Sequence, residues 1–164
     1  MAALLTASAC AGPAEAATTL LTGTVRVTVT NTAPTCDLKV GQSGQDTEVF
    51  LGYLTKGGLY RADPLEMRLE CLNGNRNAAI SASTTLKRDN DSTLVMSNGA
   101  TRMWLEDMQG NLIDLTGAGS TDPMKRFCAG DSTRDCSVKP VVNVGGNDPT
   151  GRTEAMVTFS VKYS

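Results

Sequence analysis

Residues 155–163 read Ala-Met-Val-Thr-Phe-Ser-Val-Lys-Tyr, and this stretch indicates the fold more clearly than any other part of the sequence. Every second residue in it is apolar: Ala155, Val157, Phe159, Val161 and Tyr163. Strict alternation is typical of a β-strand that buries one face and exposes the other. The stretch therefore predicts a long, half-buried strand near the C-terminal end of the chain.

A second alternating run lies near the start of the chain. Its apolar face is formed by Leu21, Gly23, Val25, Val27 and Val29. The run contains no turn that could fold it back as a hairpin before Asn31. Such a strand either pairs inside its own sheet, which is the commoner case, or adds itself to an open sheet edge of another chain. Periodicity alone leaves both possibilities open.

The middle of the chain reads as short strands separated by Gly, Asn, Asp and Pro clusters. Further alternating segments are predicted at 36–40, 49–53, 65–71, 78–83, 92–96, 101–106, 111–115 and 137–144. Residues 107–111 predict a hairpin turn. Helical periodicity never persists for three turns. Short strands at regular spacing predict an all-β protein built as a β-sandwich.

Composition restricts the possible functions. The 164 residues suit one domain, and 15 Lys and Arg against 17 Asp and Glu provide no basic field for nucleic acid. The chain contains no histidine, which excludes Ser-His and Cys-His nucleophile pairs and imidazole zinc sites. We therefore expect no enzymatic activity, no cofactor and no metal site. A small secreted hydrolase that uses two carboxylates is the least favoured alternative.

The first residues have the character of a processing segment. Residues 2–14 are mostly small and apolar, and Ala14-Glu15-Ala16 has small residues where a signal peptidase cleaves. This predicts a signal peptide over residues 1–16, without the usual positive start. Export would then remove Cys10 together with the signal peptide.

Four cysteines remain after that cleavage, and an even number in an exported domain predicts two disulfides. Three pairings are possible. Cys128 and Cys136 enclose a short polar loop and are natural partners, which leaves Cys36 to pair with Cys71.

Three segments together carry a family resemblance. Residues 23–36 run Gly-Thr-Val-Arg-Val-Thr-Val-Thr-Asn-Thr-Ala-Pro-Thr-Cys, and residues 48–52 and 65–71 follow with Glu-Val-Phe-Leu-Gly and Leu-Glu-Met-Arg-Leu-Glu-Cys. Tyr163 is the penultimate residue, and Gly151 is fourteenth from the end. The combination resembles bacterial chaperone–usher pilins of the type 1 and P pilus kind.

The resemblance implies an incomplete immunoglobulin-like β-sandwich that lacks its last strand and is completed by a donor strand from another chain. Residues 17–32 would be the donor-strand extension and residues 33–164 the pilin domain. The donor residues would be Leu21, Gly23, Val25, Val27 and Val29. The strand bordering the groove would contain Gly151, Val157, Phe159, Val161 and Tyr163.

The same resemblance implies a structural subunit of a surface fimbria that is exported through the periplasm. Its implied partners are a periplasmic chaperone, an outer-membrane usher and neighbouring pilin subunits. The alternative is a minor or tip subunit that binds a host receptor or glycan. Lys125, Arg126 and Arg134 surround the Cys128–Cys136 loop and could contribute to such a contact, although a solvated patch is the plainer interpretation.

Two departures from the family pattern stand out. Val29 occupies the position, seven residues before Cys36, where the family usually has glycine, and Gly23 lies six residues too early. This leaves the register of the inserted strand open. The second disulfide is not a general feature of the family.

Among other candidates, Trp104 could be a carbohydrate platform, but a packing role is the simpler expectation.

Overall fold

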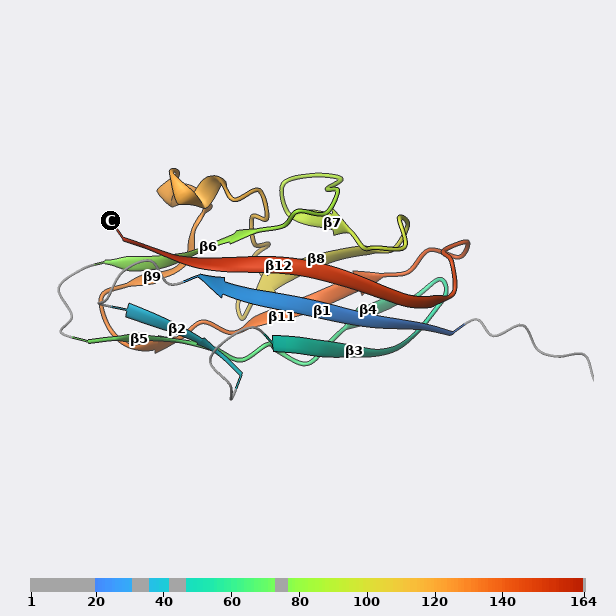
Figure 1. Ribbon diagram of the computed structural model, residues 1–164, viewed down its shortest axis with the longest axis horizontal. Helices are drawn as coiled ribbons and strands as arrows, with labels where there is room; N and C mark the ends of the chain where they lie inside the picture. The colour runs from blue at the N-terminus through green and yellow to red at the C-terminus, as the bar shows by residue number, and fades with distance from the viewer. Residues whose placement is uncertain (1–19, 31–35, 42–46, 73–76, 164) are drawn as a thin grey trace, which may run out of the picture.

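The computed structural model describes residues 20–30, 36–41, 47–72 and 77–163, which form β-strands and two short 3₁₀ helices (Figure 1). The predicted signal peptide lies outside these residues. The strands are β1 (Leu20–Thr30), β2 (Cys36–Val40), β3 (Thr47–Thr55), β4 (Leu59–Arg61), β5 (Met67–Cys71), β6 (Ala78–Ser83), β7 (Thr93–Val95), β8 (Arg102–Asp107), β9 (Phe127–Gly130), β10 (Arg134–Asp135), β11 (Val138–Asn143) and β12 (Gly151–Tyr163). The 3₁₀ helices are η1 (Ala118–Ser120) and η2 (Pro123–Lys125). No helix in the described part of the chain is long and apolar enough to cross a membrane.

Hydrogen bonds join the strands into three sheets. Their orders are β3-β1-β12-β6-β9, β10-β5-β2 and β4-β11-β8-β7. In Figure 1, β12 (red) and β1 (blue) run side by side along the long axis of the molecule. All three sheets supply side chains to one buried core, for example Phe159 from the first, Leu38 and Leu69 from the second, and Met103 and Val142 from the third. The architecture is therefore a β-sandwich around a single core.

The long alternating stretch at the C-terminal end forms β12, as predicted. Its inward face, Thr153, Ala155, Val157, Phe159 and Val161, is buried. The predicted strands at 36–40, 78–83, 92–96, 101–106 and 137–144 also form, with small differences in their ends. Of these, 36–40 buries one face and exposes the other, whereas β6 is buried at five consecutive positions and β11 at four of its six.

Two predicted segments differ from the structure. Residues 111–115 form only an isolated bridge, between Leu112 and Glu106. The Ile113 N–H still bonds to the Leu105 carbonyl of β8 at 2.9 Å, and the Leu115 N–H then bonds to the Asp91 carbonyl at 2.7 Å. The alternation of Val49, Leu51 and Tyr53 breaks at a β-bulge in β3, so that Tyr53 is exposed and Leu54 takes the buried position instead.

The turn predicted at residues 107–111 is present. The Asp107 carboxylate accepts hydrogen bonds from the backbone N–H groups of Gln109 and Asn111, at 2.9 and 2.8 Å, and from the Asn111 side chain, at 2.8 Å. Partial burial of Asp107 disfavours its charged form, but these hydrogen bonds outweigh that effect and lower its pKa. Gly110 adopts a φ of +87°, which this turn requires of it.

Both predicted disulfides are present. Cys36 and Cys71 are direct register partners on β2 and β5, with their Cα atoms 4.0 Å apart. Cys128 and Cys136 close the polar loop between β9 and β10, with Cα atoms 5.6 Å apart. The first bridge fixes the start of β2, which is where the chain enters the sandwich after β1.

Candidate functional site: the slot occupied by β1

The N-terminal strand β1 lies between β3 and β12, and we call the space that it fills the β1 slot. It pairs in parallel with β12, where Val25 lies opposite Ala155 and Val27 opposite Val157. On its other edge it pairs antiparallel with β3, where Val25 lies opposite Val49. Both edges of β1 are therefore hydrogen-bonded, and the five-stranded sheet is continuous across the slot.

The inward face of β1 is the face that the alternation predicted. Leu21, Val25 and Val27 are each 1% exposed and belong to the core, and Gly23 is buried between them. Val29, beside Phe159 at the end of the slot, is only half-buried. The strand therefore fills three side-chain positions of the core, and a sandwich without it would leave these positions open.

The structure divides the predicted groove-edge residues into two groups. Gly151, Val157 and Phe159 lie in the part of β12 that pairs with β1, because that pairing runs from Gly151 to Ser160. Val161 and Tyr163 lie beyond the end of β1 and pair with β6 instead. These last two residues support the slot from its end and do not border it.

Tyr163 connects the end of β12 to the start of β2. Its hydroxyl accepts a hydrogen bond from the Cys36 N–H at 3.0 Å and donates one to the Cys36 carbonyl at 3.2 Å. The Tyr163 carbonyl in turn accepts from Arg126 at 3.4 Å. This arrangement gives a structural role to Tyr163: its hydroxyl joins the end of β12 to the start of β2, beside the end of the slot.

The connection to Cys36 restricts how the chain's own β1 can lie. The segment from Thr30 to Cys36 spans at most about 21 Å when fully extended. The 13-residue strand β12 is about 40 Å long. Cys36 is hydrogen-bonded to Tyr163, at the C-terminal end of β12. An antiparallel β1 would place Thr30 near Gly151, and the segment between Thr30 and Cys36 is too short to span that distance. The chain's own β1 therefore fits the slot only parallel to β12.

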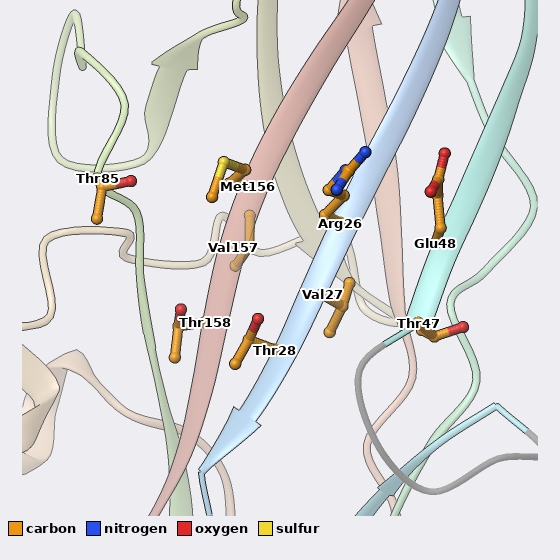
Figure 2. A pocket seen from close by; sticks show the side chains of 9 residues that line it. All are labelled: Arg26, Val27, Thr28, Thr47, Glu48, Thr85, Met156, Val157 and Thr158. Atoms are coloured by element: carbon orange, nitrogen blue, oxygen red, sulfur yellow. The ribbon is translucent and has the colours of Figure 1, made fainter.

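The outer face of the slot is polar. Figure 2 shows a shallow pocket there, lined by side chains of β1, β3 and β12 together with Thr85. Arg26 of β1 pairs with Glu154 at 3.4 Å, and Arg152 pairs with Glu154 at 2.8 Å and with Glu48 of β3 at 3.2 Å. These exposed ion pairs link the three strands but contribute little to stability.

Sequence reasoning missed the second wall of the slot. Leu51 and Leu54 of β3 are buried beneath the first half of β1. The bulge that places both leucines inward leaves no periodic pattern by which it could be recognised. Gly52, at a φ of +92° beside the bulge, is the one residue that indicates it.

The basic residues around the second disulfide are bonded within the chain. Arg134 donates to the Cys128 carbonyl at 3.0 and 2.7 Å, and burial lowers its pKa. Arg126 donates to the Gly119 carbonyl at 2.7 Å. Lys125 lies 3.0 Å from Asp114 and 3.1 Å from Asp91. The hydrogen bonds that Lys125 donates to these two carboxylates, Asp114 first, raise its pKa. These hydrogen bonds and ion pairs join the basic side chains around the loop to groups of the same chain.

The other candidate side chains also have structural partners. Trp104 donates its indole N–H to Glu106 at 3.0 Å, and Glu106 lies 3.7 Å from Arg61. Asp107 belongs to its turn and does not converge with Glu106 on a common site. Across the described residues, no group of three or more Cys, Asp or Glu side chains is arranged to hold a metal ion.

Comparisons with known proteins agree with this architecture. The crystal structure of the P pilus rod subunit PapA superimposes with a TM-score of 0.58 at 15% identity, covering 78% of this chain and 99% of that one. A chaperone–usher pilus structure concerned with rod uncoiling gives a TM-score of 0.57 at 14% identity, covering 97% and 100%. No curated protein sequence matches significantly.

These similarities confirm the predicted pilin-type sandwich, an immunoglobulin-like fold without its last strand. In the single chain, β1 of the same chain occupies the open place. The sequence model of the fimbrial protein family matches residues 20–164, which begin with β1 and include β12. The chain therefore belongs to the fimbrial protein family.

Proposed function

We propose that the chain is a structural subunit of a chaperone–usher surface fimbria and polymerises by donor-strand exchange. In this role β1 leaves its own slot and fills the slot of a neighbouring subunit. A periplasmic chaperone would occupy the slot during export, and an outer-membrane usher would catalyse the replacement. The proposed role involves no catalysis by this chain and no cofactor.

The observation that carries the proposal is the position of β1 in the fold. It is the first described strand, it reaches β2 through the short segment before Cys36, and it supplies three buried side chains to the core. Because β1 precedes the other described strands in the chain, it can leave the sheet without breaking their connections, although β3 then loses its neighbour in the sheet. Its departure would open a groove along β12 and β3, which is the acceptor that exchange requires.

The energetics suit an exchange reaction. Three buried apolar side chains contribute about 5–9 kcal/mol in total, as an upper estimate, so spontaneous departure of β1 is rare. The same contacts form again when β1 enters the slot of a neighbour. Each exchange is thus nearly balanced in contacts, and subunit concentration or an assembly factor determines its direction.

Mixing two tagged full-length chains tests the proposal. After mild warming and cooling, wild-type chains should form a ladder of SDS-resistant oligomers. Val27→Asp should form none alone, because a charged side chain cannot enter the core position. Mixed with wild type, it should still accept a strand and so cap the oligomers. Thr28→Asp, on the exposed face next to it, is the matched control and should assemble normally. Ladder formation by Val27→Asp alone would contradict the proposal.

The alternative, a tip subunit that binds a host receptor or glycan, would place the contact at the loop closed by Cys128 and Cys136. The three cations there are engaged with carbonyls and carboxylates of their own chain. Their engagement favours a structural role for the loop, and we therefore propose the fimbrial building block as the function.

A further inference from the structure

The outer face of β1 has one buried position. Thr24 points away from the core, on the side of the strand opposite to Gly23 and Val25, yet it is only 5% exposed. The other outward-facing residues of β1 are half-buried or exposed. In the sheet register, Thr24 lies between Glu154 of β12 and Phe50 of β3. Outward-pointing side chains of the two neighbouring strands therefore close over β1 at this position.

A charged network crosses β1 at the same place. Arg152 of β12 lies 3.2 Å from Glu48 of β3 and 2.8 Å from Glu154. The first of these ion pairs joins the two neighbours of β1 across the strand that lies between them. We call Glu48, Arg152 and Glu154 the outer rim of the slot. Because all three residues belong to β3 and β12, the outer rim stays with the slot when β1 leaves it.

The charges of the outer rim and of β1 are complementary. Two carboxylates and one guanidinium give the outer rim a net charge of −1. Arg26 is the one charged residue in β1. It lies 3.4 Å from Glu154 and directly opposite Glu48 in the pairing with β3, and Figure 2 shows Arg26 and Glu48 on adjacent strands of this face. Arg26 therefore neutralises the outer rim, and a strand without a cation at this position would leave its negative charge uncompensated.

Partial burial strengthens the contact between Arg26 and the outer rim. The Glu154 side chain is 27% exposed, so salt screens its charge less than that of a fully exposed carboxylate. Opposite charges that face each other on neighbouring strands stabilise a sheet, and like charges there destabilise it. Such complementarity contributes more to the choice of partner than to total affinity. The outer rim can therefore distinguish between strands although its ion pairs add little to the stability of the fold.

We infer that the outer rim is a recognition surface for the incoming strand: it selects a strand that carries a cation at the position of Arg26. The inward apolar contacts determine how tightly a strand is held, and the outer rim discriminates between strands whose apolar faces are alike. The partner so defined is β1 of a second copy of this chain, and a strand with an anion at this position is rejected. The inference deepens the proposed function and rests on it, because selection matters only for a strand that is exchanged.

Competitive peptide capture tests the inference with the full chain as the acceptor. The chain is unfolded in urea with its disulfides intact and refolded with two differently labelled peptides of residues 20–30, both at about millimolar concentration, the effective concentration of a tethered strand. Peptide that co-elutes with the chain on size exclusion has displaced the chain's own β1. Both peptides compete with the same tethered strand, so the ratio of the captured amounts does not depend on it.

Four peptides are compared: wild type, Arg26→Gln, Arg26→Glu and Thr30→Glu. The last is the matched control for Arg26→Gln, because both substitutions change the net charge by the same amount. Thr30 is exposed and lies opposite Ser160, at the other end of β1 from the part that the outer rim crosses. Loss of capture that follows net charge alone would affect the two peptides equally and would contradict the inference.

Charge selection predicts that capture depends on salt and on residue 154. At about 0.01 M salt, capture of Arg26→Gln should fall about two- to fivefold below wild type and that of Arg26→Glu about tenfold, and both differences should shrink below about twofold at about 1 M salt. Thr30→Glu should stay near wild type. In the full chain carrying Glu154→Lys the order should reverse, so that Arg26→Glu is captured better than wild type. Equal capture of these two peptides at low salt, or a preference that Glu154→Lys leaves unchanged, would overturn the inference.

A second measurement tests the outer rim within the single chain. It covers the case in which no peptide is captured at all, which would count against exchange and so against the proposed function. Urea unfolding followed by tryptophan fluorescence compares Arg26→Glu, Glu154→Lys and the double variant at low salt. Each single charge reversal should lower the unfolding midpoint, and the double variant should recover most of the loss, because the opposite charges are restored. Losses that simply add in the double variant would overturn the inference independently of any exchange.

Discussion

Truncation of Val25 measures how much the filled slot contributes to stability. Val25 is 1% exposed, and Val25→Ala removes two methyl groups from the core. Transfer of those groups accounts for about 1.6 kcal/mol, and the cavity left behind raises the loss of unfolding free energy to about 2–3 kcal/mol. Val29→Ala is the matched control, because Val29 lies on the same strand but is half-buried. The same truncation there should cost about 1 kcal/mol or less.

The single tryptophan makes this prediction measurable. Trp104 lies on β8 in a different sheet from β1, so its fluorescence during guanidinium unfolding reports on a remote part of the sandwich. We expect one cooperative transition whose midpoint falls clearly for Val25→Ala and slightly for Val29→Ala. If both variants shift the midpoint equally, or if Val25→Ala leaves it unchanged, β1 is not part of the cooperative core and the reasoning is wrong.

The remaining predictions concern the supports of the slot and one turn. Replacing Cys36 and Cys71 with serine should lower the unfolding free energy by about 4 kcal/mol, because the bridge closes a 35-residue separation, against about 2.5 kcal/mol for the bridge of the 128–136 loop; calorimetry would check the order. Tyr163→Phe should cost about 1–2 kcal/mol and speed hydrogen exchange at the start of β2, and unchanged exchange there would contradict the role of the hydroxyl. Asp107 has a lowered pKa in the folded state, so its stabilising effect is present above its unfolded value of about 4 and is lost as the pH falls through the folded value. Denaturation at several pH values should therefore show Asp107→Asn less stable than wild type at pH 7, with the difference shrinking towards pH 2.

Much of the fold could be predicted from the sequence because β2 and β12 bury every second residue. The 36–40 and 155–163 stretches alternate strictly and form β2 and most of β12 as expected. The two disulfides followed from the even cysteine count and the short loop between Cys128 and Cys136. These features depend on local pattern or covalent geometry, which a sequence displays directly.

The parts that could not be predicted depend on contacts between distant residues. The bulge that turns Tyr53 outward and Leu54 inward is set by packing against β1, and nothing local in the sequence indicates that partner. Among the described strands, the short β4 pairs only with β11, and its three residues are too few to show a period. The bond between Tyr163 and Cys36 joins residues 127 positions apart.

For the slot itself, the sequence predicted two of the strands involved: β1, which fills the slot, and β12, which pairs with it. The donor residues Leu21, Val25 and Val27 occupy core positions, as the alternation predicted. Their exchange between chains stays a prediction, because in the single chain they fill their own slot. Alternation reports that a face is buried and does not report in which copy of the chain the burial occurs.

Locking β1 into its own slot tests the exchange claim most directly. In the full chain carrying Thr28→Cys and Thr158→Cys, oxidation should join β1 to β12 across the register pair that lines the pocket in Figure 2. We expect the oxidised protein to remain monomeric under conditions in which wild type forms an SDS-resistant ladder. Mild reduction of this exposed bridge should restore the ladder, and each single cysteine variant should assemble throughout. Oligomers that form equally well from the oxidised protein would show that β1 never has to leave its slot, and would contradict donor-strand exchange.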